Sequence, residues 1–144
     1  MMREKSNKIR GVACSCSVNP TLATRMIDSI RGVFNDYIPD VWIHGDHYKK
    51  DNAGLSKGYG VSIVAETTTQ CYISTDKIYN IGDVSDPEKL GEQAALDLLD
   101  RIHHSGWIDI QTAPTIILLM GLSSNENVSE IKLGNIITDD QDPK

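Results

Sequence analysis

The segment Gly-Tyr-Gly-Val-Ser-Ile-Val-Ala-Glu-Thr-Thr, residues 58–68, holds the pattern that decides the fold of this chain. Its two glycines give the backbone a flexible entry, and an alternating run of side chains follows. Val61, Ile63 and Ala65 fall on one face of an extended strand, because successive side chains of a strand point to opposite faces. The residues between them, together with Glu66, fall on the other face. The segment therefore predicts a well-formed strand, although by itself it does not indicate a binding or catalytic function.

The composition is typical of a single soluble globular domain. A chain of 144 residues and 15.9 kDa can bury one modest core, and its 24% of charged residues is ordinary for such a domain. The longest apolar run, residues 116–120, is far shorter than the roughly 18 residues of a membrane span. The charged N-terminal segment lacks the apolar region of a signal peptide. We therefore expect the three cysteines to be reduced thiols in an intracellular protein.

The charge distribution argues against tight, autonomous RNA binding. The net charge is −6 and the isoelectric point is near 5.1. Proteins that bind nucleic acid through their own electrostatics carry a basic stripe. Here the basic residues are scattered, with small groups only in residues 3–10 and 49–57. We expect RNA, if involved, to be reached through a partner or a part of the protein outside this chain.

Outward from residues 58–68, the patterns predict an α+β fold with about five strands and three helices packed on the sheet. A polar turn at residues 68–70 predicts a hairpin between two of these strands. Asn19 is suited to cap the first helix ahead of Pro20, and Gly106 to end the second. The expected strands are 8–18, 41–44, 58–68, 71–79 and 130–133. The expected helices are 20–35, 87–105 and 107–122, the last of them kinked or started near Pro114.

The last expected helix ends in a run that is apolar on every side. Such a helix must be buried all round, and a chain of this size with two other helices on one sheet offers little room for it. We therefore expect it to pack on another subunit or on a domain outside this chain. The residues predicted to form this oligomer interface are Ile116, Ile117, Leu119 and Met120.

Two histidines and two carboxylates lie close together in the sequence, at His44, Asp46, His47 and Asp51. They could suggest a metal site. Zinc, however, usually takes four ligands at fixed spacing, and no second cluster completes this set. A solvated loop after a strand end is the favoured interpretation, and we expect no metal.

Cys14 and Cys16 stand at strand spacing, so both point to the same face. Val12 and Val18 share that face, which favours two small buried residues over a redox pair. A redox pair would normally have two intervening residues at a helix start. His103 and His104 end a helix, where a cation complements the dipole; capping is favoured over catalysis.

The sequence holds no assembled active site. Glu66 could act as an acid or base, but no carboxylate or histidine is adjacent to it. Gly58-Tyr59-Gly60 lacks the glycine spacing and the following helix of a phosphate-binding loop. No Ser-His-Asp or Cys-His set is recognisable. We therefore predict no catalytic residues.

Four segments, residues 10–13, 35–42, 57–69 and 86–119, carry a resemblance to a known family. With these motifs in one consistent order, the chain resembles part of the RNA 3'-terminal phosphate cyclase family. It is most similar to the eukaryotic cyclase-like branch, and the match covers about residues 8–134. Within the last segment, the matching pattern consists of Glu88, Leu90, Gly91, Ala94, Ala95, Leu98, Leu99, Ile102, Gly106 and Asp109.

The resemblance implies a division of the chain. Residues 8–106 correspond to the family's α/β insert domain, and residues 107–134 to the helix and strand that start the last repeat of its large domain. Residues 1–7 and 135–144 are expected to be disordered tails. The family's glycine-rich signature is absent from this chain, and the matching segment lacks the histidine that takes AMP from ATP. No catalytic residue is therefore transferred.

Three hypotheses follow. The favoured one, implied by the resemblance, is a non-catalytic, nucleolar protein without cofactor that acts in small-subunit ribosome biogenesis and 18S rRNA processing. Its partners would be a GTPase assembly factor and the pre-ribosomal particle, with pre-rRNA contacted indirectly, no membrane and a homo-oligomer. The alternative is part of an active cyclase that uses ATP and Mg²⁺ to make 2',3'-cyclic phosphate ends. A third is a stand-alone oligomerising domain unrelated to RNA.

Under the favoured hypothesis, partner contacts are expected on the loop before residue 58 and on the strand after it. Loops on a rigid scaffold most often carry contacts. The predicted partner-binding residues are Lys49, Lys50, Lys57, Tyr59 and Glu66.

Overall fold

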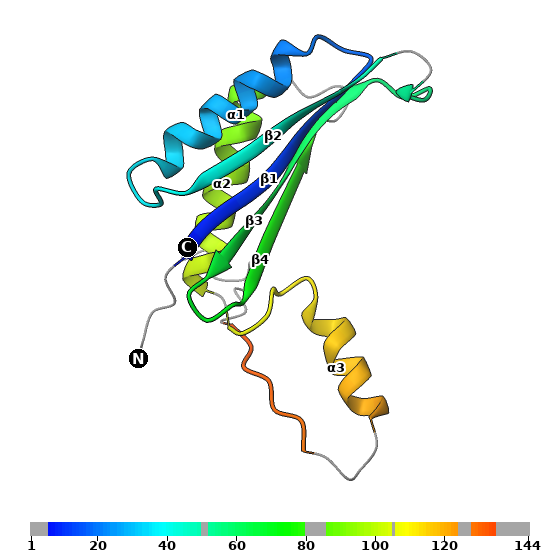
Figure 1. The fold of residues 1–144 in the computed structure, drawn as a ribbon. Coiled ribbons are helices and arrows are strands. Elements are labelled where there is room, and N and C mark those ends of the chain that lie inside the picture. Colours follow the sequence, from blue (N-terminus) through cyan, green and yellow to red (C-terminus); the bar gives the residue numbers. More distant parts are fainter. Residues whose placement is uncertain (1–5, 50–51, 80–85, 105, 124–127, 135–144) are drawn as a thin grey trace, which may run out of the picture.

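A computed structural model describes residues 6–49, 52–79, 86–104, 106–123 and 128–134, for 6 and 7 the backbone alone. It confirms the α+β class (Figure 1). None of its helices is both long and apolar enough to cross a membrane among these residues. The elements, in chain order, are β1 (Ser6–Cys16), α1 (Thr21–Phe34), β2 (Val41–Tyr48), β3 (Gly58–Thr67), β4 (Tyr72–Ile78), α2 (Pro87–His104) and α3 (Ala113–Leu122).

The described strands form one mixed sheet in the order β2-β1-β3-β4. β1 runs parallel to β2, and α1 makes the crossover that a parallel pair requires. β3 is antiparallel to both of its neighbours, and the predicted β3–β4 hairpin is present. Its turn places Gln70 at φ 61°, in the left-handed region. At the start of α1, the Asn19 side chain accepts a hydrogen bond from the Thr21 amide at 3.1 Å.

The core lies between one face of the sheet and the helices α1 and α2, which pack side by side on it (Figure 1). The alternation read in residues 58–68 is confirmed, because Val61, Ile63 and Ala65 of β3 all face these helices. β1 contributes Ile9 and Ala13 to the same layer. From the helices come Ala23, Met26, Ile27, Ile30, Phe34, Leu90, Ala94, Ala95 and Leu98.

The expected burial of the two cysteines of β1 is wrong. Ile9, Ala13 and Ser15 occupy the helix-covered face, so Cys14 and Cys16 point to the opposite face and are only partly buried. The small residues of β1 allow this orientation of the strand, because they leave room on the helix-covered face for larger side chains of neighbouring elements. At Gly11, for example, a Cβ would lie 2.7 Å from Ile63 Cγ2.

The expected fifth strand at 130–133 is absent from the described residues, and α3 does not pack on the sheet (Figure 1). Instead, the Trp107 amide donates a hydrogen bond to the Lys132 carbonyl oxygen at 2.8 Å. A further strand cannot pair in the middle of β4, because Ser74 there already has partners. Its amide donates to Asp109 at 3.1 Å, and its carbonyl oxygen accepts from Arg101 at 2.7 Å.

Two further boundaries concern the last helix and the N-terminus. The last helix begins at Ala113, as in the expectation of a start near Pro114, and residues 107–112 form turns in which the Asp109 carbonyl accepts hydrogen bonds from Thr112 and Ala113. The N-terminal tail expected over residues 1–7 overlaps β1, which starts at Ser6. Residues 1–5 and 135–144 lie outside the described residues.

Candidate functional site

The sheet face opposite α1 and α2 is uncovered by any described helix and is the main candidate surface. Strand alternation brings several large side chains to it. Their exposures are unusual for apolar residues, reaching 66% for Trp42 and Ile78 and 61% for Tyr72. We call it the open face. Its side chains include Arg10, Val12, Cys14 and Cys16 of β1, Trp42, His44, Asp46 and Tyr48 of β2, Ser62, Val64 and Glu66 of β3, and Tyr72, Ser74, Asp76 and Ile78 of β4.

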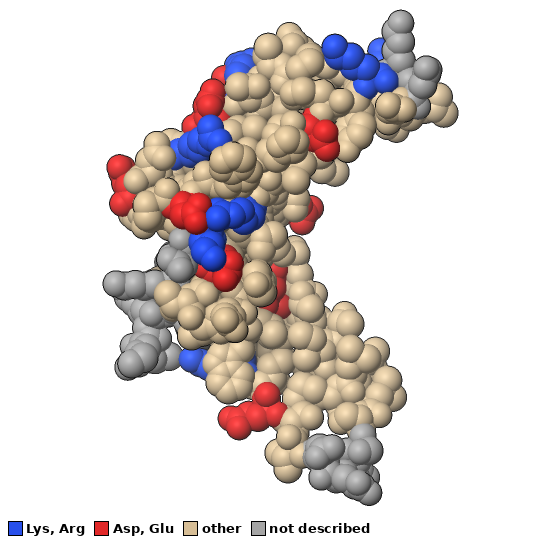
Figure 2. Space-filling model, in the orientation of Figure 1, with Lys and Arg blue, Asp and Glu red and all other residues tan. Residues whose placement is uncertain are grey.

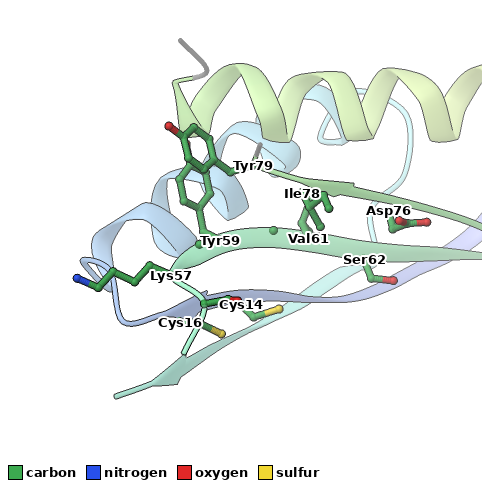
Figure 3. A pocket seen from close by; sticks show the side chains of 12 residues that line it. Cys14, Cys16, Lys57, Tyr59, Val61, Ser62, Asp76, Ile78 and Tyr79 are labelled. Atoms are coloured by element: carbon green, nitrogen blue, oxygen red, sulfur yellow. The ribbon is translucent and has the colours of Figure 1, made fainter. Parts of the chain in front are cut away.

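A pocket of about 350 Å³ lies at the end of the open face next to the loop that precedes β3 (Figure 3). Two glycines of β3, at alternate positions of the strand, explain it. Gly60 is paired with Cys14 of β1 on one side and with Ile78 of β4 on the other, and Gly58 is paired with Cys16. The missing side chains leave a hollow between the cysteines and Ile78.

Gly60 is required by close packing. A Cβ at this position would lie 2.8 Å from the Lys77 carbonyl oxygen and 3.0 Å from Ile78 Cγ2. At Gly58, by contrast, a Cβ would meet nothing within 4 Å. The strand can therefore accept a side chain at residue 58 but not at residue 60.

Two tyrosines line the pocket from the strand ends (Figure 3). The rings of Tyr59 and Tyr79 stack with centroids 4.9 Å apart and an interplanar angle of 15°. The Tyr79 amide also donates to the Tyr59 carbonyl oxygen at 2.9 Å. The two interactions extend the β3–β4 pairing at this end of the pocket, and the rings themselves project toward the helix-covered side of the sheet (Figure 3).

The Cys14 thiol is a poor nucleophile as placed. Burial raises the pKa of Cys14, and the neighbouring Cys16 and Asp46 raise it further. A raised pKa keeps the thiol protonated and uncharged at neutral pH. Tyr48 donates a hydrogen bond to Asp46 at 2.8 Å, which raises the pKa of the Tyr48 phenol. This part of the open face is therefore suited to packing rather than to covalent chemistry.

Most cations of the open face are used in ion pairs. Arg10 holds Asp40 through two contacts of 2.8 Å, and this pairing lowers the pKa of Asp40. Lys8 lies 3.6 Å from Glu66. Asp46 and Asp76 make no ion pair with any residue of the described ranges. Near the pocket, two carboxylates and the Lys57 ammonium group are therefore without an ion-pair partner among the described residues.

The structure brings together only part of the predicted partner-binding set. Lys57 and Tyr59 line the pocket, and Lys49 lies at the end of β2. Glu66 stands near the opposite end of β3 from Gly58 and pairs with Lys8 instead. Lys50 lies outside the described residues.

The two histidines considered for a metal site do not converge. Both lie in β2, which extends to Tyr48 rather than ending at residue 44 in a loop. Their positions have opposite parity, so His44 reaches the open face whereas His47 lies 2.9 Å from the buried Ser15 hydroxyl through Nδ1. Asp51 lies outside the described residues. Elsewhere in the described chain, no group of three or more His, Cys, Asp or Glu side chains could hold a metal ion.

The predicted oligomer interface lies on α3, which protrudes from the body of the molecule (Figure 1). Ile117 and Leu119 are 48% and 60% exposed, and Ile116 and Met120 are partly buried. Two more leucines belong to the same surface, Leu118 and Leu122. Figure 2 shows no charged side chain over this helix.

Comparison with known proteins assigns this sequence to a family. The family model for the insert domain of RNA 3'-terminal phosphate cyclase matches residues 1–103. The chain belongs to the RNA 3'-terminal phosphate cyclase family. The match ends within α2, so α3 lies beyond the insert-domain segment.

Curated members of the cyclase family resemble most of the chain. A "Probable RNA 3'-terminal phosphate cyclase-like protein" of Dictyostelium discoideum is 37% identical over 92% of it. The human "RNA 3'-terminal phosphate cyclase-like protein" is 40% identical over 90%, and the Saccharomyces cerevisiae "rRNA processing protein RCL1" is 33% identical over 88%. The chain spans only 39%, 35% and 34% of the length of these relatives.

Proposed function

We propose that this chain acts in ribosome biogenesis, as part of a cyclase-like protein that promotes rRNA processing without catalysing a reaction itself. The observation that carries the proposal is its 33–40% identity to relatives named as cyclase-like and rRNA processing proteins. The proposal places the protein in the nucleolus, in the steps toward the small subunit and 18S rRNA. It would work through contacts with a GTPase assembly factor and the pre-ribosomal particle.

Two surfaces support a role in protein contact. The open face presents large exposed side chains without a helix over it, and α3 presents apolar side chains to solvent. Exposed apolar patches of this kind mark interaction sites. The net charge of −6 suits contact with basic proteins better than direct contact with phosphate groups.

A segment exchange tests the proposal. Replacing the matching third of the Saccharomyces cerevisiae rRNA processing protein with this chain should preserve production of mature 18S rRNA, measured by northern blotting in cells that lack the native protein. A matched exchange that also carries Gly91→Ala, which disrupts helix packing as argued below, should lose it. Accumulation of unprocessed precursors with the unmodified exchange would contradict the proposal.

Adenylylation separates this proposal from an active cyclase that uses ATP and Mg²⁺. We expect no transfer of label from α-labelled ATP to the exchanged protein or to this chain, measured by autoradiography after denaturing electrophoresis. An active RNA 3'-terminal phosphate cyclase serves as the positive control. A labelled band at the size of the exchanged protein would overturn the non-catalytic role.

We also propose that α3 mediates self-association of the isolated chain. Burying its apolar side chains against a second copy, at about 25 cal/mol per Å², contributes several kcal/mol. The double variant Leu118→Lys/Leu122→Lys should shift the protein from dimer to monomer in sedimentation velocity. Leu96→Lys is the control, because Leu96 is similarly exposed at 50% but lies on α2. A wild-type protein that stays monomeric at high concentration would rule out this interface.

A further inference from the structure

The pocket on the open face combines an apolar hollow with two carboxylates that make no ion pair with a described residue. Asp46 is paired in register with Cys14, on the β2 side of the hollow. Asp76 is paired with Ser62 and lines the pocket on the β4 side. We propose that this hollow binds a large apolar side chain of an extended, basic peptide segment, with Lys or Arg residues of that segment placed over Asp46 and Asp76. The inference rests on the protein-contact role proposed above and names the chemistry of the partner.

The size and lining of the hollow suit an apolar anchor. Its volume of about 350 Å³ lies near the lower end of the range for ligand pockets, roughly 300–1,000 Å³. Ile78 of β4 and the side chain of Cys16 provide apolar surface on the open face. The protonated Cys14 thiol behaves as a further small apolar group. A desolvated pocket that receives one large side chain is the usual centre of a protein–protein contact.

The charges around the hollow select a basic segment. Asp40, just before β2, and Glu66 have cation partners, whereas Asp46 and Asp76 have none among the described residues. Lys57 also lines the pocket, but its side chain points away from Cys14 and Ile78 (Figure 3). The overall charge of −6 adds a long-range attraction for a basic segment.

Single-stranded nucleic acid is the less favoured occupant. Exposed aromatic side chains such as Trp42 and Tyr72 could stack on bases. The phosphates of a strand that crossed the hollow, however, would approach Asp46 and Asp76. Because binding of this kind depends on neutralising phosphates with Lys and Arg, the pattern of charges opposes it.

Fluorescence polarisation with short labelled peptides tests the inference. The probe is Gly-Lys-Leu-Lys-Gly, and the comparison peptides are Gly-Lys-Gly-Lys-Gly and Gly-Glu-Leu-Glu-Gly. We expect the probe to bind. The peptide without leucine should bind at least about tenfold more weakly, and the peptide with glutamates should not bind. A labelled single-stranded oligouridine tests the other occupant and should bind more weakly than the probe.

Variants of the protein localise the site. Gly58→Leu fills the hollow, and its Cβ meets no neighbouring atom. This variant should lower the affinity for the probe about tenfold. Gly32→Leu is the matched control, since a Cβ there is also unobstructed but lies on exposed α1 surface, and it should leave affinity unchanged. The double variant Asp46→Asn/Asp76→Asn should lower affinity several-fold at low salt and flatten its salt dependence.

Several results would overturn the inference. They are absence of binding by the probe, equal binding by the peptide without leucine, unchanged affinity in Gly58→Leu, and tighter binding of oligouridine. None of these would affect the rRNA-processing proposal, which the segment exchange tests separately. Conversely, if the exchange failed while peptide binding was intact, the rRNA-processing proposal would be rejected and the peptide-binding inference would stand.

Discussion

Gly91→Ala should destabilise this protein by about 2–3 kcal/mol, although alanine is the better helix former. Gly91 lies inside α2 at its contact with α1. A Cβ there would lie 2.6 Å from the Met26 carbonyl oxygen and 3.2 Å from Met26 Cα. Backbone atoms cannot rotate away, so the helices must separate, and overpacking of this kind typically costs about 1–3 kcal/mol. The separation also loosens the layer that contains Ile30.

Urea denaturation followed by circular dichroism measures this effect. Gly32→Ala is the control, because it makes the same change in the neighbouring helix α1 where a Cβ would meet nothing within 4 Å. That variant should gain up to about 1 kcal/mol from helix propensity alone. Equal free energies of unfolding for the two variants would show that the close contact between α1 and α2 does not limit stability.

Asp109→Ala should cost about 2 kcal/mol and release the base of α3 from the sheet. Asp109 is only 5% exposed, and its Oδ2 accepts hydrogen bonds from the Ser74 amide at 3.1 Å and the Ser74 hydroxyl at 2.9 Å. Its Oδ1 lies 3.7 Å from Arg101. Truncation leaves two partly buried donors of Ser74 without an acceptor, and an unsatisfied buried donor typically costs about 1–3 kcal/mol.

Two measurements separate the local effect from the global one. Urea denaturation gives the change in the free energy of unfolding, and hydrogen exchange of the Ser74 amide reports whether the edge of β4 opens. Asp109→Asn keeps an acceptor oxygen for Ser74 and should lose less than Asp109→Ala. An alanine variant within about 0.5 kcal/mol of wild type, with an unchanged exchange rate, would contradict the role of this carboxylate.

The elements with strong periodicity could be predicted from sequence. Residues 58–68 alternate so regularly that β3 ends within one residue of expectation, at Thr67. The strand expected at 41–44 extends to Tyr48 because pairing with β1 continues through Gly45 and Asp46, residues that are rare in strands. Local propensity carries no information about that parallel partner.

The burial of β1 illustrates a different limit. Both faces of the strand carry small or branched side chains, so the alternation of the cysteines with Ala13 and Ser15 does not say which face meets the helices. The size of the neighbours decides it, since Ile63 fits over Gly11. The family resemblance, in contrast, was carried by motifs of several segments, and it is confirmed.

The pocket could not be found from sequence because it depends on register. Gly58 and Gly60 were visible as an alternate pair of glycines, which is the one available signal. Their neighbours, Cys14 and Ile78, are separated from them by long stretches of chain and meet only in the sheet. Asp109 was noted only as part of a family pattern, and its contact with Ser74 also required the fold.

The contact of residues 106 and 107 with the segment around Lys132 has an evolutionary consequence. Polypeptide leaves the domain and returns to it at one point, so the stretch between Ala113 and Lys132, beyond the Asp109 contact with β4, can lengthen, shorten or be replaced while the route of the strands stays the same. Closing a longer loop costs little, roughly 0.6 kcal/mol for each doubling of its length. Natural variation in this lineage can therefore remodel the projecting helix freely and still inherit an intact sheet.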